Sequence, residues 1–400
     1  MKIKIFVFLI LFFISCFSLT AWDFGILVEQ NIETNSNTSS DSIGFNYSGI
    51  FIPYYSSLLG ENGEFYISAG FNYNTDPFNY IPELLRTEFT MRFGAAELKL
   101  GRIPYRDPLG MVAEGLFDGA QFSYDTLLGT LSAGAWYTGF LYKKSAAIEM
   151  TYNELQHNYR DVDYDNFYDT YFAPRRMFSS LRWEHPSLGG LLNAKLDILG
   201  QFDLSGADLN TQYFSARLAM PSRIVVLDLG GVFGLAQNEE DFGVFFAADT
   251  GLTFMFPTVL ENHITLRGRF SSGVIQDSII GSFLPLTTIQ YGELLKAKLS
   301  ALSVLSFNYR SRFNRILFAD LGASYFVRSD LGTYKEYPVI GIDSNGYFLG
   351  AEVYAGTFWA LSSEIQMKLG GGMFLPSLGD AAPDADMLWR VELNFLISLF

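Results

Sequence analysis

The last stretch of the chain, residues 387–400, reads M-L-W-R-V-E-L-N-F-L-I-S-L-F and alternates apolar with polar side chains. One face is entirely apolar and carries Met387, Trp389, Val391, Leu393, Phe395, Ile397 and Leu399. The opposite face carries the polar residues Arg390, Glu392, Asn394 and Ser398. Because successive side chains of a β-strand point to opposite sides, this alternation predicts a strand with one apolar and one polar face.

The same two-faced pattern recurs along most of the chain. Between residues 84 and 93, for example, Phe89 and Met91 alternate with Glu88, Thr90 and Arg92. No stretch shows a convincing period of 3.6 residues, so we expect little helix. The alternation predicts strands at residues 23–31, 42–54, 63–73, 84–93, 95–103, 116–124, 129–142, 176–185, 190–203, 210–219, 223–236, 242–255, 262–272, 290–311, 315–328, 346–358, 361–374 and 386–400.

The stretch 290–311 is long enough to be two strands. Its apolar residues nevertheless keep one parity from Tyr291 through Leu295 and Leu299 to Tyr309. A turn usually breaks such parity, so we interpret the stretch as one strand. The whole chain then has about 18 strands, within a range of about 16 to 20.

The composition is that of a membrane protein without a membrane helix. Hydrophobic residues make up 49% of the chain and charged residues only 17%, yet no apolar run long enough for a spanning helix follows the N-terminus. Only helices and closed barrels satisfy their backbone in lipid. A soluble sandwich or propeller would also alternate, but no blade-length repeat is present. We therefore expect an all-β chain folded as a transmembrane antiparallel up-and-down β-barrel, with no separate plug domain.

The N-terminus has the features of a secretory signal. Lys2 and Lys4 precede an apolar run at residues 5–14, and small residues follow up to Ala21. We place a signal peptide at residues 1–21 and one barrel domain at residues 22–400. An alternative is lipidation of Cys16, which is the only cysteine and leaves no disulfide framework.

Connections of two lengths join the predicted strands. Short turns, such as residues 94–95 and 221–222, are typical of the periplasmic side of a barrel. The long loops, which we expect on the outside, are residues 32–41, 74–83, 104–115, 143–175, 273–289, 329–345 and 375–385.

Residues 98–124 read L-K-L-G-R-I-P-Y-R-D-P-L-G-M-V-A-E-G-L-F-D-G-A-Q-F-S-Y. A strand ending in Gly-Arg, a loop with Pro and Gly, and a strand opening on Asp-Gly resemble outer-membrane porins. The signal and the aromatic-rich composition look like those of spirochaete outer-membrane proteins. The porin resemblance implies a loop at 103–116 that folds inward, with charges at the constriction from Arg102, Arg106, Asp107, Glu114 and Asp118. The alternative is a surface loop that Arg–Asp pairs hold against the wall.

Charged side chains on the polar faces are candidates for the lining of a lumen. They are Arg86, Glu88, Arg92, Lys99, Lys195, Asp197, Arg267, Arg269, Lys296, Lys298, Glu364, Lys368, Arg390 and Glu392. Most of them are basic, although the chain carries a net charge of −15. We therefore expect a lumen without a strong preference for cations.

These features predict an outer-membrane channel for passive diffusion of small hydrophilic solutes. The expected partners are outer-membrane lipid, the barrel-assembly machinery and the solutes, and further copies of the chain are a candidate partner. The acidic balance argues against nucleic acid. The alternative is a surface adhesin, or a barrel that binds lipid or other hydrophobic ligands, acting through its long outer loops, above all 143–175.

Metal and catalytic signals are weak. Asp161, Asp163 and Asp165 are spaced as at the start of an EF-hand, but Asn166 and Phe172 replace its required glycine and glutamate. At most a loose divalent-ion site remains. The three histidines have no Ser/Asp constellation nearby in the sequence. We expect no cofactor and no enzymatic activity.

Overall fold

The computed structural model describes residues 21–36, 43–75, 78–206, 208–238, 241–258, 260–273, 282–331 and 346–399. The predicted signal peptide, apart from Ala21, and the lipidation of Cys16 lie outside the described residues.

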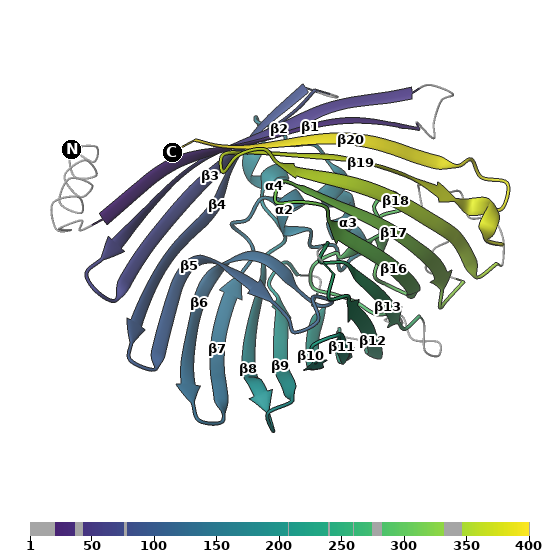
Figure 1. Ribbon diagram of the computed structural model, residues 1–400. Coiled ribbons are helices and arrows are strands. Elements are labelled where there is room, and N and C mark those ends of the chain that lie inside the picture. Colours follow the sequence, from purple (N-terminus) through teal and green to yellow (C-terminus); the bar gives the residue numbers. More distant parts are fainter. Residues whose placement is uncertain are drawn as a thin grey trace.

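Eighteen strands form one antiparallel sheet in which each strand pairs with the next, and β20 pairs with β1 to close the barrel (Figure 1). The predicted all-β up-and-down barrel is confirmed, as is its strand number. The wall strands are β1 (Ala21–Ser36), β2 (Ile43–Leu59), β3 (Gly63–Thr75), β4 (Phe78–Phe93), β5 (Ala96–Arg106), β6 (Glu114–Thr126), β7 (Gly129–Tyr137), β8 (Arg176–Leu188), β9 (Leu192–Asp203), β10 (Asn210–Pro221), β11 (Val225–Gln237), β12 (Phe242–Met255), β13 (His263–Ser271), β16 (Leu302–Arg312), β17 (Leu317–Arg328), β18 (Phe348–Ala360), β19 (Ile365–Leu375) and β20 (Leu388–Leu399).

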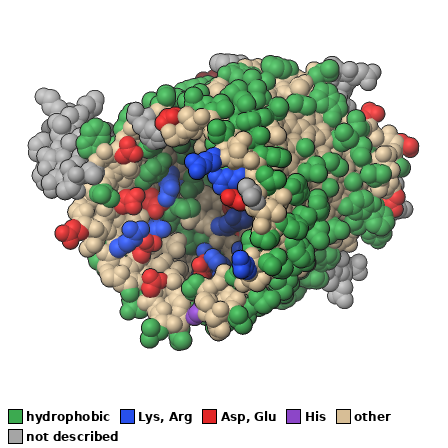
Figure 2. Space-filling view, viewed as in Figure 1, with side chains coloured by type: hydrophobic (Ala, Val, Ile, Leu, Met, Phe, Trp, Pro, Cys, Tyr) green, Lys and Arg blue, Asp and Glu red, His purple; other side chains and the backbone are tan. Residues whose placement is uncertain are grey.

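The two faces of the strands meet two environments. On β20, Val391 and Leu399 are exposed on the outside of the barrel, whereas Arg390 and Glu392 are buried within it. Figure 2 shows the result, an outer surface dominated by hydrophobic side chains around a hollow with Lys and Arg side chains. The predicted faces of this strand are therefore right. No described helix is long and apolar enough to cross a membrane.

The predicted strand at 290–311 is wrong in its first half. Only β16, from Leu302, belongs to the wall, and residues 290–301 hold the small ladder of β14 (Gln290–Tyr291) and β15 (Ala297–Lys298). Leu295, Leu299 and Ala301 are fully buried. An alternating sequence predicts that one side of a strand is apolar, but it does not show whether lipid or protein covers that side. Here other parts of the chain inside the barrel cover it.

Some wall strands extend further toward the long-loop side than the sequence predicted. β1 continues to Ser36, and β4 begins at Phe78, within the predicted loop 74–83. β7 instead ends at Tyr137, five residues earlier than its predicted end at 142. The polar residues at these strand ends are typical of a loop, but in the structure their backbones pair with the neighbouring strands.

Three long connections fold into the barrel. They are the inward loop (107–113), the helical loop (138–175) with α2 (Lys143–Ala146), α3 (Tyr152–Tyr159) and α4 (Phe167–Tyr171), and the described inner segment (282–301). Figure 1 shows the helices within the ring of strands. The main cluster of buried apolar side chains includes Met111, Ile148, Phe283 and Leu286 from these connections. The hydrophobic core of the barrel therefore lies in part of its lumen. Near the C-terminus, η1 (Pro376–Leu378) follows β19.

Candidate functional site: the barrel lumen

The inward loop turns around the carboxylate of Asp107. One carboxylate oxygen accepts backbone N–H groups from Met111, Val112 and Ala113 at 3.0, 2.8 and 3.0 Å, and the other accepts that of Leu109 at 3.0 Å. Charged acceptors form the stronger class of hydrogen bond. Asp107 is only 2% exposed. Its carboxylate therefore fixes the shape of the loop.

Charged pairs hold the inward loop to its own wall. Arg102 donates to both carboxylate oxygens of Asp118 at 2.8 Å, across directly paired positions of β5 and β6, and to the carbonyl of Phe140 at 3.0 Å. Arg106 and Glu114 lie 3.2 Å apart in the next ion pair. The loop is folded inward as the porin resemblance implies. Its charged side chains also form ion pairs that hold the loop against the wall, as the alternative interpretation of the sequence predicted.

A row of residues crosses six neighbouring strands, from β8 to β13. We call this row the basic belt, and its directly paired members are Glu184, Lys195, Arg217, Gly230, Asp249 and Arg269. The distance from the Lys195 ammonium to Glu184 is 3.0 Å, and that from Arg269 to Asp249 is 3.5 Å. Arg217 pairs with Asp228 on β11. These carboxylates hold the cationic heads in place along the wall.

A cavity of about 730 Å³ lies between the basic belt and the inward loop. Its lining holds five basic and three acidic residues, namely Arg106, Arg182, Lys195, Arg217, Arg267, Asp107, Glu114 and Glu184. A Cβ at Gly230 would stand 2.2 Å from Leu109, so the glycine lets the tip of the loop reach the wall. Basic residues outnumber acidic ones in this lining, and each of the five forms an ion pair with a carboxylate of the lining or of the adjoining wall.

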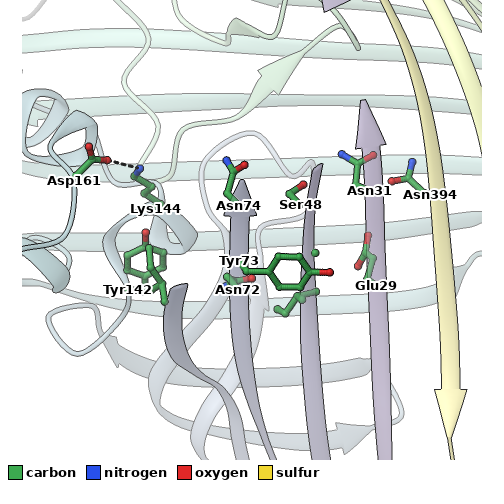
Figure 3. A pocket seen from close by; sticks show the side chains of 13 residues that line it. Glu29, Asn31, Ser48, Asn72, Tyr73, Asn74, Tyr142, Lys144, Asp161 and Asn394 are labelled. Atoms are coloured by element: carbon green, nitrogen blue, oxygen red, sulfur yellow. Dashed lines mark ion pairs between the residues drawn. The ribbon is translucent and has the colours of Figure 1, made fainter. Parts of the chain in front are cut away.

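The opposite wall carries a second row, which we call the amide belt. Its directly paired members are Lys368, Asn394, Asn31, Ser48 and Asn74, on β19, β20, β1, β2 and β3. In the strand order these strands lie about half-way around the barrel from the basic belt. Figure 3 shows four of the members, from Asn74 to Asn394, side by side on neighbouring strands.

A cavity of about 440 Å³ adjoins the amide belt. The helical loop forms its other side with Tyr142 and with the ion pair of Lys144 and Asp161, whose charged atoms are 3.7 Å apart. Its lining holds one basic and two acidic residues, the second acid being Glu29. This cavity therefore differs from the first in having mostly neutral polar groups.

Three predicted lining residues meet at the end of the amide belt. Glu392 accepts hydrogen bonds from Lys368 at 3.0 Å and from the hydroxyl of Tyr354 at 2.9 Å. Arg390 lies 3.2 Å from Glu392 and 3.4 Å from Glu293 of the inner segment. The cluster joins β18, β19 and β20 to the chain inside the barrel.

Three other candidates do not lie on wall strands. Glu364 belongs to the short turn before β19 and is fully exposed, because the strand begins one residue later. Lys296 and Lys298 belong to the inner segment. Lys298 lies 2.5 Å from Glu149, so it joins the inner segment to the helical loop. The sequence interpretation of a single strand at 290–311 had placed these two lysines on the wall.

The remaining candidates form ion pairs on the inner face or at the short-turn rim. Arg86 pairs with Glu88 on β4, while Glu97 binds both Arg92 and Lys99. Asp197 accepts from Arg182 at 2.7 Å, Tyr105 at 3.1 Å and Ser180 at 3.2 Å, and Arg267 pairs with Asp249. Most of these ion pairs therefore join neighbouring strands, and Glu97 and Asp249 each hold two cations.

The helical loop is held by a buried ion pair at its base. Arg176 lies 2.7 Å from Glu154, which also closes the capping box of α3 with Thr151. Lys143 is buried and donates to the carbonyl of Arg160. Burial, with the nearby charges of Lys144 and Arg160, lowers the pKa of Lys143 to about 8. The ammonium ion is costly to keep charged at this position.

The spaced aspartates of the helical loop do not form a cage. Asp161 pairs with Lys144, and the Asp163 carboxylate accepts the backbone N–H of Asp165 at 2.9 Å. Within the described residues, no three His, Cys, Asp or Glu side chains gather as metal ligands do.

Sequence reasoning missed several luminal residues. Arg182 and Arg217 alternate with the outward Leu181 and Leu218, so the parity of their strands could have identified them. Glu352 gave no such signal. Its carboxylate accepts N–H groups of residues 293–295 at 2.6 to 3.0 Å and so anchors the inner segment.

The closed 18-stranded barrel is similar to solved structures of outer-membrane porins. The chain matches the crystal structure of OccK2 (OpdF) of Pseudomonas aeruginosa in complex with glucuronate with a TM-score of 0.63, 11% identity, and coverage of 96% of this chain and 97% of that one. OpdO of the same organism matches with a TM-score of 0.62, 11% identity and coverage of 95% and 98%. The outer-membrane protein OpdK matches at 0.59, 10% identity, and 95% and 99% coverage.

Sequence comparison adds nothing further. No protein-family model matches the chain, and no curated protein matches it. At identities of 10–12% the structural likeness shows a shared fold.

Proposed function

We propose that the protein is an outer-membrane channel through which small hydrophilic solutes diffuse passively. The observation that carries the proposal is the contrast between an apolar outer surface and a lumen with two cavities bordered by charged and amide side chains. An 18-stranded barrel is wide enough for an aqueous channel when its loops leave room. The architecture shared with porins supports this function.

The basic belt favours anionic solutes, and carboxylates above all. A guanidinium or ammonium group binds carboxylate oxygens through charge-assisted hydrogen bonds, and the cavity beside the belt holds five basic residues against three acidic ones. The structure of OccK2 was determined with glucuronate, a carboxylate. We expect the lumen to lack a strong cation preference despite the net charge of −15.

Further features of this proposal stay predictions. They are the signal peptide at 1–21, contact with outer-membrane lipid, insertion by the barrel-assembly machinery, association with further copies, and the spirochaete-type origin. The spirochaete-type origin rests on the signal and the aromatic-rich composition, and the others follow from the expected place of such a barrel in an outer membrane.

The test uses the purified barrel in lipid. Swelling of liposomes in sugars of increasing size measures openness and cutoff, and reversal potentials in planar bilayers across a KCl gradient measure ion preference. We expect size-limited swelling and a reversal potential near zero or on the anion side. A closed lumen or a strong cation preference would contradict the proposal.

The alternative, a surface adhesin or a binder of hydrophobic ligands, draws on one observation. Tyr152, Tyr159, Tyr164 and Tyr168 of the helical loop are all exposed, and tyrosine is enriched in binding surfaces. A barrel that shows no current steps but binds a host ligand or a lipid through this loop would favour the alternative.

A further inference from the structure

Three members of the amide belt offer hydrogen-bonding groups that the described part of the protein does not use. The side chains of Asn31, Ser48 and Asn394 form no hydrogen bond with any described residue, and Oδ1 of Asn31 is buried without a partner. A buried polar atom without a partner is destabilising, so a ligand that pairs with it gains binding free energy. Each amide can supply two donors and one acceptor, and the serine hydroxyl can act as either.

The register places these groups at regular intervals. Asn394 is directly opposite Asn31, and Asn31 is directly opposite Ser48. Neighbouring strands are about 4.8 Å apart, so the row presents groups that can both donate and accept at roughly that spacing. Figure 3 shows them along one edge of the cavity. A row of this kind matches a molecule that carries several hydroxyl groups on one side.

The rest of the cavity fits an uncharged ring. Ile50, Ile81 and Tyr142 give its lining apolar surface, and Tyr142 is held by stacking on Tyr171, with ring centres 4.9 Å apart. The nearby charges, Glu29 and the pair of Lys144 and Asp161, leave an excess of one acidic group in the lining. A carboxylate is therefore repelled here, whereas it is attracted at the basic belt.

We propose that the amide belt and its cavity form a binding subsite for the hydroxyl groups of a sugar ring. This proposal rests on the proposed channel function and deepens it, because the preferred solute then carries a hydroxyl-rich ring and an acidic group. In this proposal the amide belt binds the hydroxyl groups of the ring, and the basic belt attracts the acidic group. A site built to bond hydroxyl groups discriminates against an analogue that lacks them.

The experiment compares two anions of similar size in planar bilayers, D-glucuronate and cyclohexanecarboxylate. Bi-ionic reversal potentials of their sodium salts give the ratio of the two permeabilities for the full barrel. The test variant replaces Asn31 and Asn394 by leucine, which is close to asparagine in size. In the control variant Asn308→Leu, an amide on the inner face of β16, outside the amide belt, is replaced.

We expect the glucuronate to cyclohexanecarboxylate ratio to fall by about threefold to tenfold in the double variant, which corresponds to the loss of one or two net hydrogen bonds. The control should change the ratio by less than about twofold on the same scale. A second double variant, Asn31→Ala with Asn394→Ala, widens the lumen. If the leucine side chains act only by narrowing the passage, the ratio of glucuronate to cyclohexanecarboxylate permeability should rise in this variant. If the subsite exists, the ratio should fall.

The outcomes separate the two proposals. Wild-type current with a ratio that both variants leave unchanged overturns the subsite and leaves the channel standing. A wild-type barrel that conducts neither anion overturns both. Competition by D-glucose, seen as reduced glucuronate current in the wild type but not in the leucine variant, supports the subsite independently.

Discussion

The basic belt and the amide belt are built in the same way and offer opposite chemistry. Each is a row of inward side chains, one from each of several neighbouring strands, placed by direct cross-strand pairing. The cations of the basic belt are held by carboxylates, whereas Asn31, Ser48 and Asn394 have no hydrogen-bond partner among the described residues. The barrel fixes positions, and the residue type at each inward position sets what a wall can bind.

Reversing charge in the basic belt should have the largest effect. In Lys195→Glu with Arg217→Glu, two adjacent cations become anions beside Glu184 and Asp228. We expect the anion-to-cation permeability ratio to fall on the order of tenfold, because field focusing in a narrow channel multiplies small changes in charge. Reversal potentials in a KCl gradient measure this ratio.

The matched control changes net charge equally but away from the belt. Arg92→Glu with Arg223→Glu alters exposed residues near the short turns. An equal fall in the control would mean that overall charge, and not the belt, governs selectivity. Circular dichroism of each purified barrel confirms that the strands are retained.

Added salt should weaken the attraction of anions to the basic belt and leave the binding of hydroxyl groups at the amide belt unchanged. We expect this effect to be smaller than that of charge reversal. Raising ionic strength from about 0.1 M to about 1 M shortens the Debye length from about 10 Å to about 3 Å. We expect the permeability preference for glucuronate over sodium to drop several-fold, while swelling rates in D-glucose stay constant. A glucose rate that falls in parallel would show that the walls do not act separately.

Releasing the inward chain should have the smallest effect on selectivity. Asp107→Ala leaves four loop N–H groups without their acceptor beside the basic belt, and Glu352→Ala leaves three in the inner segment. Each lost bond costs about 1 kcal/mol. We expect higher and noisier single-channel conductance in both variants, with a shift in ion preference only for Asp107→Ala. Equal shifts would contradict the assignment of the inward loop to the basic wall.

Much of the fold was predictable because alternation is a local property. The two faces of β20, the strand number and the inward direction of Arg390 and Glu392 follow from residues two apart in the sequence. The pair of Arg102 with Asp118 lies within one hairpin and fits the alternative in which Arg–Asp pairs hold the loop against the wall, whereas the pairing of Arg106 with Glu114 was not predicted.

The inner segment shows where local reasoning fails. Residues 295–301 alternate as a wall strand does, yet their apolar side packs against other protein inside the barrel. Glu352 is another such case, since its partners lie about 57 to 59 residues away and are backbone groups. The spacing of side chains in the sequence predicts neither of these two environments.

The sequence by itself determined that the chain consists of strands with one apolar face and one polar face that carries charged and amide side chains. This follows because the side of a strand to which a residue points depends only on whether its position is odd or even. Only the tertiary structure decided which inner residues stand together. Asn394 meets Asn31 because the last strand closes onto the first, and the two belts lie on opposite sides of the barrel because 18 strands complete one turn. Closure joins residues from opposite ends of the chain, and no local pattern specifies that register.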